Sequence, residues 1–299
     1  MQDSNQDVPQ KVIHIEDLYR QKTVEHNDLV TSVAKMDKIP MKFFELAVSC
    51  LDTENAPMNN TVLLSKKTLF SFFKADDNDK HSRFKKALTT LHTQSIFEVR
   101  EINEKGKLNF KIISPISSSE WNDYDDVVAI KFTEDIMPYL IDLKRNFTQY
   151  LITDIMELNS KYSIVLYKWF SMNYNQYETY KGTAKRTKIQ INQMKNPYIK
   201  IQELRRITNT VNEYERIFDF EKNILKLALE EINEHTHFTV TYDKIKKGRS
   251  IVGIQFYISK KIIKSSLPYK ENDLESLKDK AQKENEEQNL FNKAHRNGS

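Results

Sequence analysis

Two stretches of the chain repeat one order of hydrophobic patterns: a helical period, an alternating run, a short turn and a second alternating run. The first stretch covers residues 82–114 and changes from helical spacing to alternation after Thr93. The second covers residues 214–259 and changes in the same way after His235. A change from a period near 3.6 to a period of 2 indicates a helix followed by a β-hairpin. The chain therefore predicts two helix–hairpin units.

Each alternating pair is joined by a turn that carries Lys and Gly, EKGK at residues 104–107 and KKGR at residues 246–249. Gly106 and Gly248 stand where a tight hairpin needs a positive φ. A helix followed by a basic-tipped hairpin suits DNA, because the helix fits the major groove while the cations meet phosphates. We predict an α+β, mainly helical fold: two tandem winged-helix domains with a pseudo-duplicated helix–strand–wing–strand pattern.

The remaining patterns predict shorter elements around these two units. Pro40 fits the first position of a helix, and Ser65 fits an N-cap. The aromatic-rich stretch 148–176 predicts helices whose rings form core and not a platform for stacked bases. The other predictions are an arm or edge strand over 11–19, helices over 26–36, 40–52, 65–73 and 199–209, strands over 62–64 and 185–191, a strand followed by a helix over 127–143, and a loop over 117–126.

These elements divide the chain into four parts. Residues 1–24 form an N-terminal arm, and residues 25–147 form an N-terminal winged-helix domain. Residues 148–264 form a C-terminal winged-helix domain that binds DNA. Residues 265–299 are rich in charged and amide side chains and are predicted to be a mobile tail.

Composition excludes several other classes of protein. Hydrophobic residues make up 39% of the 299 residues, which is enough for two cores, and Cys50 permits no internal disulfide and no multi-cysteine zinc site. No run reaches the ~20 apolar residues of a membrane span, and the N-terminus lacks the core of a signal peptide. The five glycines lack the spacing of a phosphate-binding loop. We expect a soluble protein of the cytoplasm that is not an enzyme and uses no cofactor and no metal.

Positive charge is concentrated in the second half of the chain. Residues 148–264 hold 20 Lys and Arg against 12 Asp and Glu, whereas residues 25–145 hold 17 against 19. The net charges are therefore +8 and −2, so the second domain carries the stronger attraction for a polyanion.

The helix over residues 214–235 takes the place of a recognition helix, whose polar face meets base edges. Its candidate base contacts are Arg216, Asp219, Lys222, Asn223 and Lys226. Bidentate geometry suits Arg216 to guanine and Asn223 to adenine, whereas the two lysines also suit phosphate. The candidate phosphate contacts are Arg205 and Arg206 on the preceding helix and Lys246, Lys247 and Arg249 on the wing. In the first domain the equivalent positions are His81, Ser82, Arg83, Lys85, Lys86 and Thr89, with Lys105 and Lys107 on the wing.

An ordered set of segments resembles the initiator replication proteins of theta-replicating, iteron-containing bacterial plasmids. The segments are PMKFFELAVSCLD, YSIVLYKWF, IQELRRIT, FDFEKNILKLALEEIN and KKGRSIVGIQFYIS, and the resemblance spans residues 28–259. It implies tandem winged helices that bind direct repeats at a plasmid origin, help to open adjacent AT-rich DNA and recruit host replication proteins such as a helicase or an initiator.

The same resemblance implies how the domains share the work. The C-terminal domain makes the main base contacts, and the N-terminal domain contacts phosphate or serves as a dimer interface. Members of such a family bind repeats as monomers and form dimers that repress their own promoter.

Two other functions fit parts of the sequence. A winged-helix transcriptional regulator would use the same DNA contacts. A rolling-circle nickase of the HUH type is suggested by His235 and His237, two alternating histidines that would hold a metal while one of the 14 tyrosines attacks the phosphodiester. The residue between them is a threonine and no third ligand is identifiable, so the nickase is the weaker alternative.

Overall fold

The structure is a computed structural model that describes residues 12–18, 21–73, 80–102 and 105–261. By its internal contacts the chain divides into residues 1–259 and residues 260–299. Both helix–hairpin units lie in the first of these parts. The predicted tail over 265–299 and most of the N-terminal arm lie outside the described residues.

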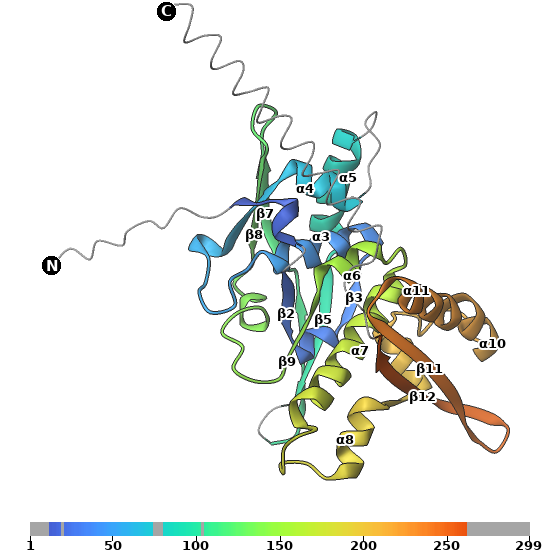
Figure 1. Ribbon diagram of the computed structural model, residues 1–299. Coiled ribbons are helices and arrows are strands. Elements are labelled where there is room, and N and C mark those ends of the chain that lie inside the picture. The colour runs from blue at the N-terminus through green and yellow to red at the C-terminus, as the bar shows by residue number, and fades with distance from the viewer. Residues whose placement is uncertain (1–11, 19–20, 74–79, 103–104, 262–299) are drawn as a thin grey trace, which may run out of the picture. The chain divides into compact units, whose positions relative to one another are not determined.

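The first half of the chain combines a central helix with several small sheets (Figure 1). The helix α3, Lys38–Ser49, is buried along most of its length and packs against α5, Lys80–Gln94, and β2, Lys22–His26. The other elements here are β1 Val12–Ile13, α1 Ile15–Leu18, β2 Lys22–His26, α2 Asn27–Val30, β3 Val33–Lys35, η1 Met58–Asn60, β4 Thr61–Ser65, α4 Lys66–Phe73, α5 Lys80–Gln94, β5 Ile96–Ile102, β6 Leu108–Ile113, β7 Ile116–Trp121, β8 Val127–Phe132, η2 Met137–Tyr139 and β9 Phe147–Leu151.

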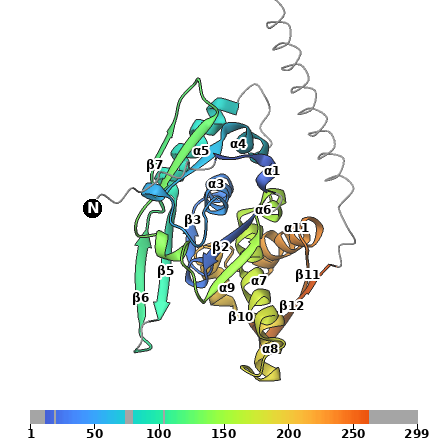
Figure 2. The same cartoon turned by 60° about the vertical axis from the view of Figure 1, so that its left-hand side comes forward.

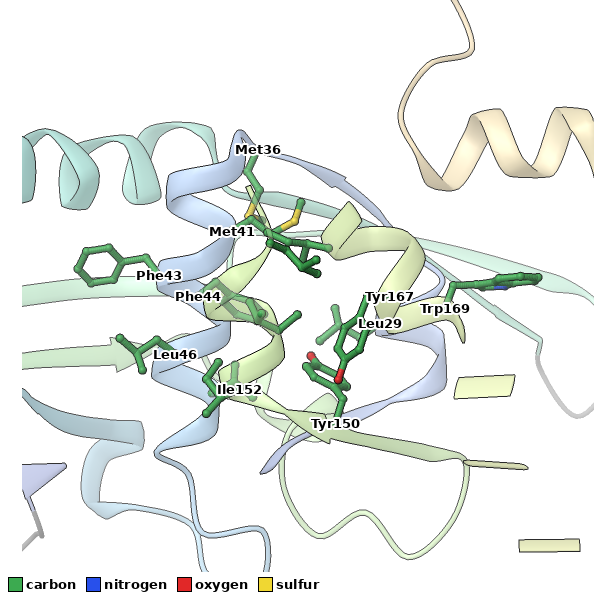
Figure 3. Close-up of a cluster of buried hydrophobic side chains, with 14 of the residues drawn as sticks. Leu29, Met36, Met41, Phe43, Phe44, Leu46, Tyr150, Ile152, Tyr167 and Trp169 are labelled. Atoms are coloured by element: carbon green, nitrogen blue, oxygen red, sulfur yellow. The ribbon is translucent and has the colours of Figure 1, made fainter. Parts of the chain in front are cut away.

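Aromatic side chains of α3 join it to its neighbours on two sides. The Phe43 ring lies 6.3 Å from the ring of Phe84 on α5, and the Phe44 ring lies 4.9 Å from the ring of Phe97 on β5. Figure 3 shows Phe43 on the side of α3 that faces away from Tyr150 and Tyr167. The helix therefore forms the middle of the first core, and the wing of the first unit is attached to it.

The second half contains a long helix near its start and ends in a long hairpin. The helix α7, Lys161–Tyr180, starts at Ser160, whose hydroxyl accepts from the backbone N–H of Tyr162 as an N-cap. The elements of this half are α6 Ile152–Glu157, α7, α8 Lys188–Lys195, β10 Tyr198–Lys200, α9 Ile201–Ile207, α10 Ile217–Phe220, η3 Glu221–Lys226, α11 Leu227–His235, β11 Phe238–Lys247 and β12 Ser250–Lys260.

The two units are similar but differ in which wing strand is covered. In each, a short strand that precedes the helices adds to the hairpin, which gives the three-stranded sheets β3-β5-β6 and β10-β12-β11. In the first unit β3 pairs with β5, the first strand of the wing. In the second unit β10 pairs with β12, the second strand of the wing. The outer strand is therefore β6 in one unit and β11 in the other (Figure 2).

A buried ionic cluster joins α7 to the first core. The Lys168 Nζ lies 2.8 Å from an Oε of Glu25 on β2 and 2.5 Å from an Oε of Glu45 on α3. The Tyr150 hydroxyl on β9 donates to the other Oε of Glu45 at 2.5 Å. Burial, reinforced by the charge of Glu45, raises the pKa of Glu25 to about 7. Attraction to both carboxylates raises the pKa of Lys168 although burial alone would lower it.

Several short elements differ from those expected from the sequence. Residues 117–126 are not all loop, because β7 forms the outer strand of the sheet β1-β4-β8-β7 and needs few apolar side chains there. Residues 185–191 do not form a strand: Thr187 and Gln190 make a capping box that starts α8. Residues 26–36 form not one helix but the short helix α2 followed by the strand β3.

Three further boundaries also shift. Residues 133–143 contain only the short 3₁₀ helix η2, and β10 occupies the start of the helix expected over 199–209. The helix expected over 214–235 begins at Ile217, because Arg216 is an extended N-cap residue. The strand expected over 62–64 is present as β4.

Candidate DNA interface

The helix before the second wing is continuous from Ile217 to His235 and contains one wide turn. Residues 217–220 and 227–235 are α-helical, and Glu221–Lys226 form a π-helical turn. The buried side of this helix carries Phe220, Ile224, Leu225, Ala228, Leu229 and Ile232. Figure 1 shows the helix beside the β11–β12 hairpin. The opposite side is the surface that a recognition helix offers to DNA.

Most of the predicted base contacts lie on this open side. Arg216, Lys222, Asn223 and Lys226 are exposed, and Asp219 is half-buried. The Asn223 side-chain amide donates to the backbone carbonyl of Asp219 at 2.9 Å, which fixes its orientation. The structure thus gathers four of the five predicted residues on one accessible face.

The second wing carries its cations at the tip. Lys246, Lys247 and Arg249 are exposed around Gly248, whose φ of 64° is the left-handed conformation expected of this glycine. Three cations within four residues give the tip a strong local positive potential, which suits contact with phosphates.

The wing is also tied to the recognition helix, which the sequence patterns did not indicate. Glu221, in the π-helical turn, accepts from the Tyr242 hydroxyl at 2.6 Å and pairs with the Lys244 Nζ at 3.0 Å. Although burial opposes it, these two donors lower the pKa of Glu221. The negative charge of Glu221 is therefore neutralised within the protein, and Glu221 holds β11 against the helix.

Arg205 is engaged inside the second domain. Its guanidinium donates to four backbone carbonyl oxygens between Thr210 and Glu215, at 2.6–3.3 Å, and lies 4.9 Å from the ring centre of Phe220. The same turn contains Asn209 and Tyr214 at a φ of 52° each, a conformation unfavourable for residues other than glycine. Arg205 therefore fixes the strained turn that leads into the recognition helix, and its predicted phosphate contact would compete with these bonds.

Arg206 also makes contacts within the protein, and it links α9 to the segment that follows α2. It forms an ion pair with Glu203 and donates through Nη2 to the backbone carbonyl of Thr31, after α2, at 3.0 Å. Only 12% of its side chain is exposed. Its role in this structure is a structural one, and a phosphate contact stays a prediction.

In the first unit the predicted contacts follow one side of α5. His81, Ser82, Arg83, Lys85, Lys86 and Thr89 are all exposed, whereas Phe84, Leu88 and Leu91 face the core. The His81 ring lies 5.5 Å from the ring of Phe70, edge to face, and the Thr89 hydroxyl donates to the carbonyl of Lys85. Lys105 and Lys107 are exposed at the wing on either side of Gly106, whose φ is 72°. The structure brings these helix residues together but does not test their contacts with DNA.

The two histidines of the nickase alternative do not share a strand face. His235 is the last residue of α11, and His237 precedes β11. The His237 Nδ1 lies 2.5 Å from Asp154 Oδ2, and the Tyr167 hydroxyl donates to the same oxygen at 2.9 Å. No group of three metal-ligating side chains occurs among the described residues, and no helix in that part of the chain is long and apolar enough to span a membrane.

Two helix–wing units in tandem, each with a cationic exposed face, define a double winged-helix DNA-binding protein. The chain belongs to the initiator replication protein family: the family's first winged-helix model matches residues 22–171, and its second matches residues 200–258. The predicted family and the tandem winged-helix fold are thereby confirmed.

Both a curated relative and a solved structure illustrate what the chain is similar to. A replication initiation protein of Escherichia coli is 25% identical over 168 residues, which are 55% of this chain and 45% of the relative. The chain thus matches less than half the length of that protein. The crystal structure of the Pi initiator protein in complex with iteron DNA is similar at a TM-score of 0.64 with 19% identity, over 82% of this chain and 99% of that one. The second likeness supports the fold.

Proposed function

We propose that this protein is a plasmid replication initiator that binds direct repeats, or iterons, at an origin. The observation that carries the proposal is the exposed face of the second recognition helix, with Lys222, Asn223 and Lys226, beside a wing with three cations at its tip. Family membership and the fold shared with an initiator crystallised on iteron DNA support the same function.

The geometry supports a division of contacts within the second domain. Arg216 is the N-cap of the helix, and the first turns of the helix enter the major groove, where Arg216 pairs with guanine and Asn223 with adenine. Lys222, Lys226 and the wing tip neutralise phosphates and set the register. In the first domain, the exposed side of α5 extends the contact to neighbouring DNA.

Footprinting of the full-length protein on the noncoding DNA that flanks its own gene tests this proposal. We expect protection of regularly spaced direct repeats on supercoiled DNA with magnesium and no strand breakage. Protection of a single operator would favour a transcriptional regulator. A site-specific break that disappears in His237→Ala would favour a nickase.

The salt dependence of binding tests the role of the wing. Replacing Lys246, Lys247 and Arg249 together by alanine should reduce the slope of log K against log salt by roughly 2.7, since each phosphate contact contributes about 0.9. A matched control replaces the exposed Lys185, Arg186 and Lys188, before and at the start of α8, and removes the same charge. An equal change in both variants would contradict a specific role for the wing.

We further propose that the first domain forms dimers through β6. In the described part of the chain β6 pairs only with β5, and its outward side chains Leu108, Phe110 and Ile112 are all exposed, Ile112 to 75%. A strand with an unpaired edge and an apolar face is a template for a second strand, and the same segment of another copy satisfies both features. Dimers of this kind would bind DNA differently from monomers and would allow repression of the protein's own promoter.

Sedimentation of Ile112→Lys at several concentrations tests the dimer. We expect a charge on this face to shift the protein toward monomer while binding to a single repeat is kept. Exposed Ile189 on α8 supplies the control change Ile189→Lys. A wild-type chain that stays monomeric at high concentration would refute this interface. Origin opening and recruitment of a host helicase or initiator complete the proposed function and are tested by permanganate mapping of melted bases and by pull-down from host extract.

A further inference from the structure

Two large apolar side chains stand on the open side of the second recognition helix. Phe218 is 68% exposed and Leu227 is 55% exposed, and neither belongs to the buried core. Their neighbours on the same side are the polar residues Lys222, Asn223 and Lys226. Exposed apolar surface on this side is unfavourable without a partner, because removing apolar surface from water would stabilise the complex by about 25 cal/mol for each Å².

The π-helical turn aligns these side chains with the polar ones. In a regular α-helix, residues four apart drift around the axis in one direction, because a turn holds 3.6 residues. A π turn holds more residues and reverses that drift between Glu221 and Lys226. Two rows with a spacing of four result: Phe218–Lys222–Lys226, which lies opposite the buried Phe220, Ile224 and Ala228, and Asp219–Asn223–Leu227, which lies beside the first row.

Burial of the intervening residues supports this arrangement. Leu225 and Leu229 are also buried, so the core side keeps its register across the wide turn. The open side therefore carries one apolar group near the start of the helix and another after it, with amide and ammonium groups between them. The turn is also the point where Glu221 holds β11, which fixes the helix relative to its wing.

Major-groove chemistry identifies what such apolar groups contact. Of the four bases only thymine presents a methyl group there, whereas the others present donors and acceptors alone. We propose that Phe218 and Leu227 each contact a thymine C5-methyl group and so determine part of the DNA sequence that this protein reads. The inference rests on the proposed function, and it names the bases that the helix selects.

The spacing of the two residues limits where those thymines lie. Nine residues separate Phe218 from Leu227, which is about 13 Å along a helix. One strand of DNA rises about 3.4 Å per base, so the two thymines lie within about four base pairs of each other. The bases read by Arg216 and Asn223 fall within or beside that interval.

Replacement of thymine by uracil tests the proposal, since uracil lacks only the methyl group. The preferred sequence is first selected from random duplexes with the full-length protein, and each thymine is then replaced singly. We expect two positions at which uracil weakens binding about fourfold, the equivalent of about 0.8 kcal/mol for one buried carbon group.

Variants assign each position to a residue. Phe218→Ala should abolish the effect of uracil at one position, and Leu227→Ala should abolish it at the other. In a double-mutant cycle, replacing a thymine should therefore cost nothing further once the residue that contacts it has been changed to alanine. Ile189→Ala, at an equally exposed isoleucine on α8, should leave both effects intact. Circular dichroism of each variant checks that these exposed changes preserve the fold.

The possible outcomes distinguish a failure of this inference from a failure of the proposed DNA-binding function. Selection of a sequence whose binding is unaffected by uracil, or by either variant, overturns the thymine contacts while the DNA-binding function stands. Enrichment of no sequence overturns both. Effects of uracil that persist in both variants assign the methyl contacts to other residues and also overturn the inference.

Discussion

Replacement of Lys168 by methionine tests the buried ionic cluster most directly. Methionine keeps the length of the side chain but removes the cation that neutralises Glu25 and Glu45, both of which are almost fully buried. Loss of one partner from a buried pair costs about 3–5 kcal/mol, because the remaining charge is left without compensation. At roughly 2–4 °C per kcal/mol for a chain of this size, the melting temperature should fall by about 10 °C at pH 8.

The pH dependence of stability provides a second test of the same cluster, because the direction of the change can be predicted. The pKa of Glu25 is raised to about 7 in the folded protein from 4.5, so the folded state binds this proton more tightly than the unfolded state. Its contribution to stability is complete below about pH 4.5 and is lost as the pH rises toward 7. Without Lys168 the carboxylates favour protonation still more strongly, so the variant should lose less stability at pH 5 than at pH 8.

Thermal unfolding followed by circular dichroism at both pH values measures these effects. Lys161→Met is the matched control, because it removes a lysine from the same helix whose partner Asp37, at 3.9 Å, is 75% exposed. A loss below 1 kcal/mol in Lys168→Met, or an equal loss in both variants, would refute the role assigned to the cluster.

Three further variants test other contacts. Glu25→Gln should raise the melting temperature above that of the wild type at pH 8 and flatten its dependence on pH, since burial of the charge is no longer required. Arg205→Lys should lower the free energy of unfolding by about 1.5–3 kcal/mol in urea, because an ammonium cannot bridge four carbonyl oxygens, whereas the exposed Arg216→Lys should change stability little and DNA affinity more. Gly248→Ala places a Cβ at a φ of 64° and should cost about 1–2 kcal/mol in the same assay, with no clash to relieve because nothing lies within 4 Å.

The sequence predicted the two helix–wing units well because each is encoded by local periodicity. The switch at His235, and the positive φ at Gly106 and Gly248, depend on residues within one turn of each other. The exposed residues of the second helix were also foreseeable, since they lie off its apolar stripe. The π-helical turn was not, because the turn depends on how the helix packs over its whole length.

The misassigned elements and the engagement of two predicted cations within the protein have separate causes. The strand β7 is the outer strand of its sheet, and its sequence shows no apolar alternation that would predict a strand. The helix α8 was predicted as a strand because Ile189 and Ile191 alternate with polar residues. Arg205 and Arg206 looked like surface cations, yet both point back into the protein. The signal available for α8 was its capping box, T-x-x-Q, whereas no local signal marks either arginine.

The two wings differ in which of their strands lies at the outer edge of the sheet, and this difference affects how each domain behaves in solution. The outer strand of the second unit, β11, carries Lys246 and Lys247 next to the wing tip, and repulsion between such charges discourages strand-to-strand association. The outer strand of the first unit carries instead an apolar row. The two wings thus differ in their outer edges: under the proposed dimer contact, self-association would use the apolar edge of the first domain and leave the cationic wing of the second accessible to DNA.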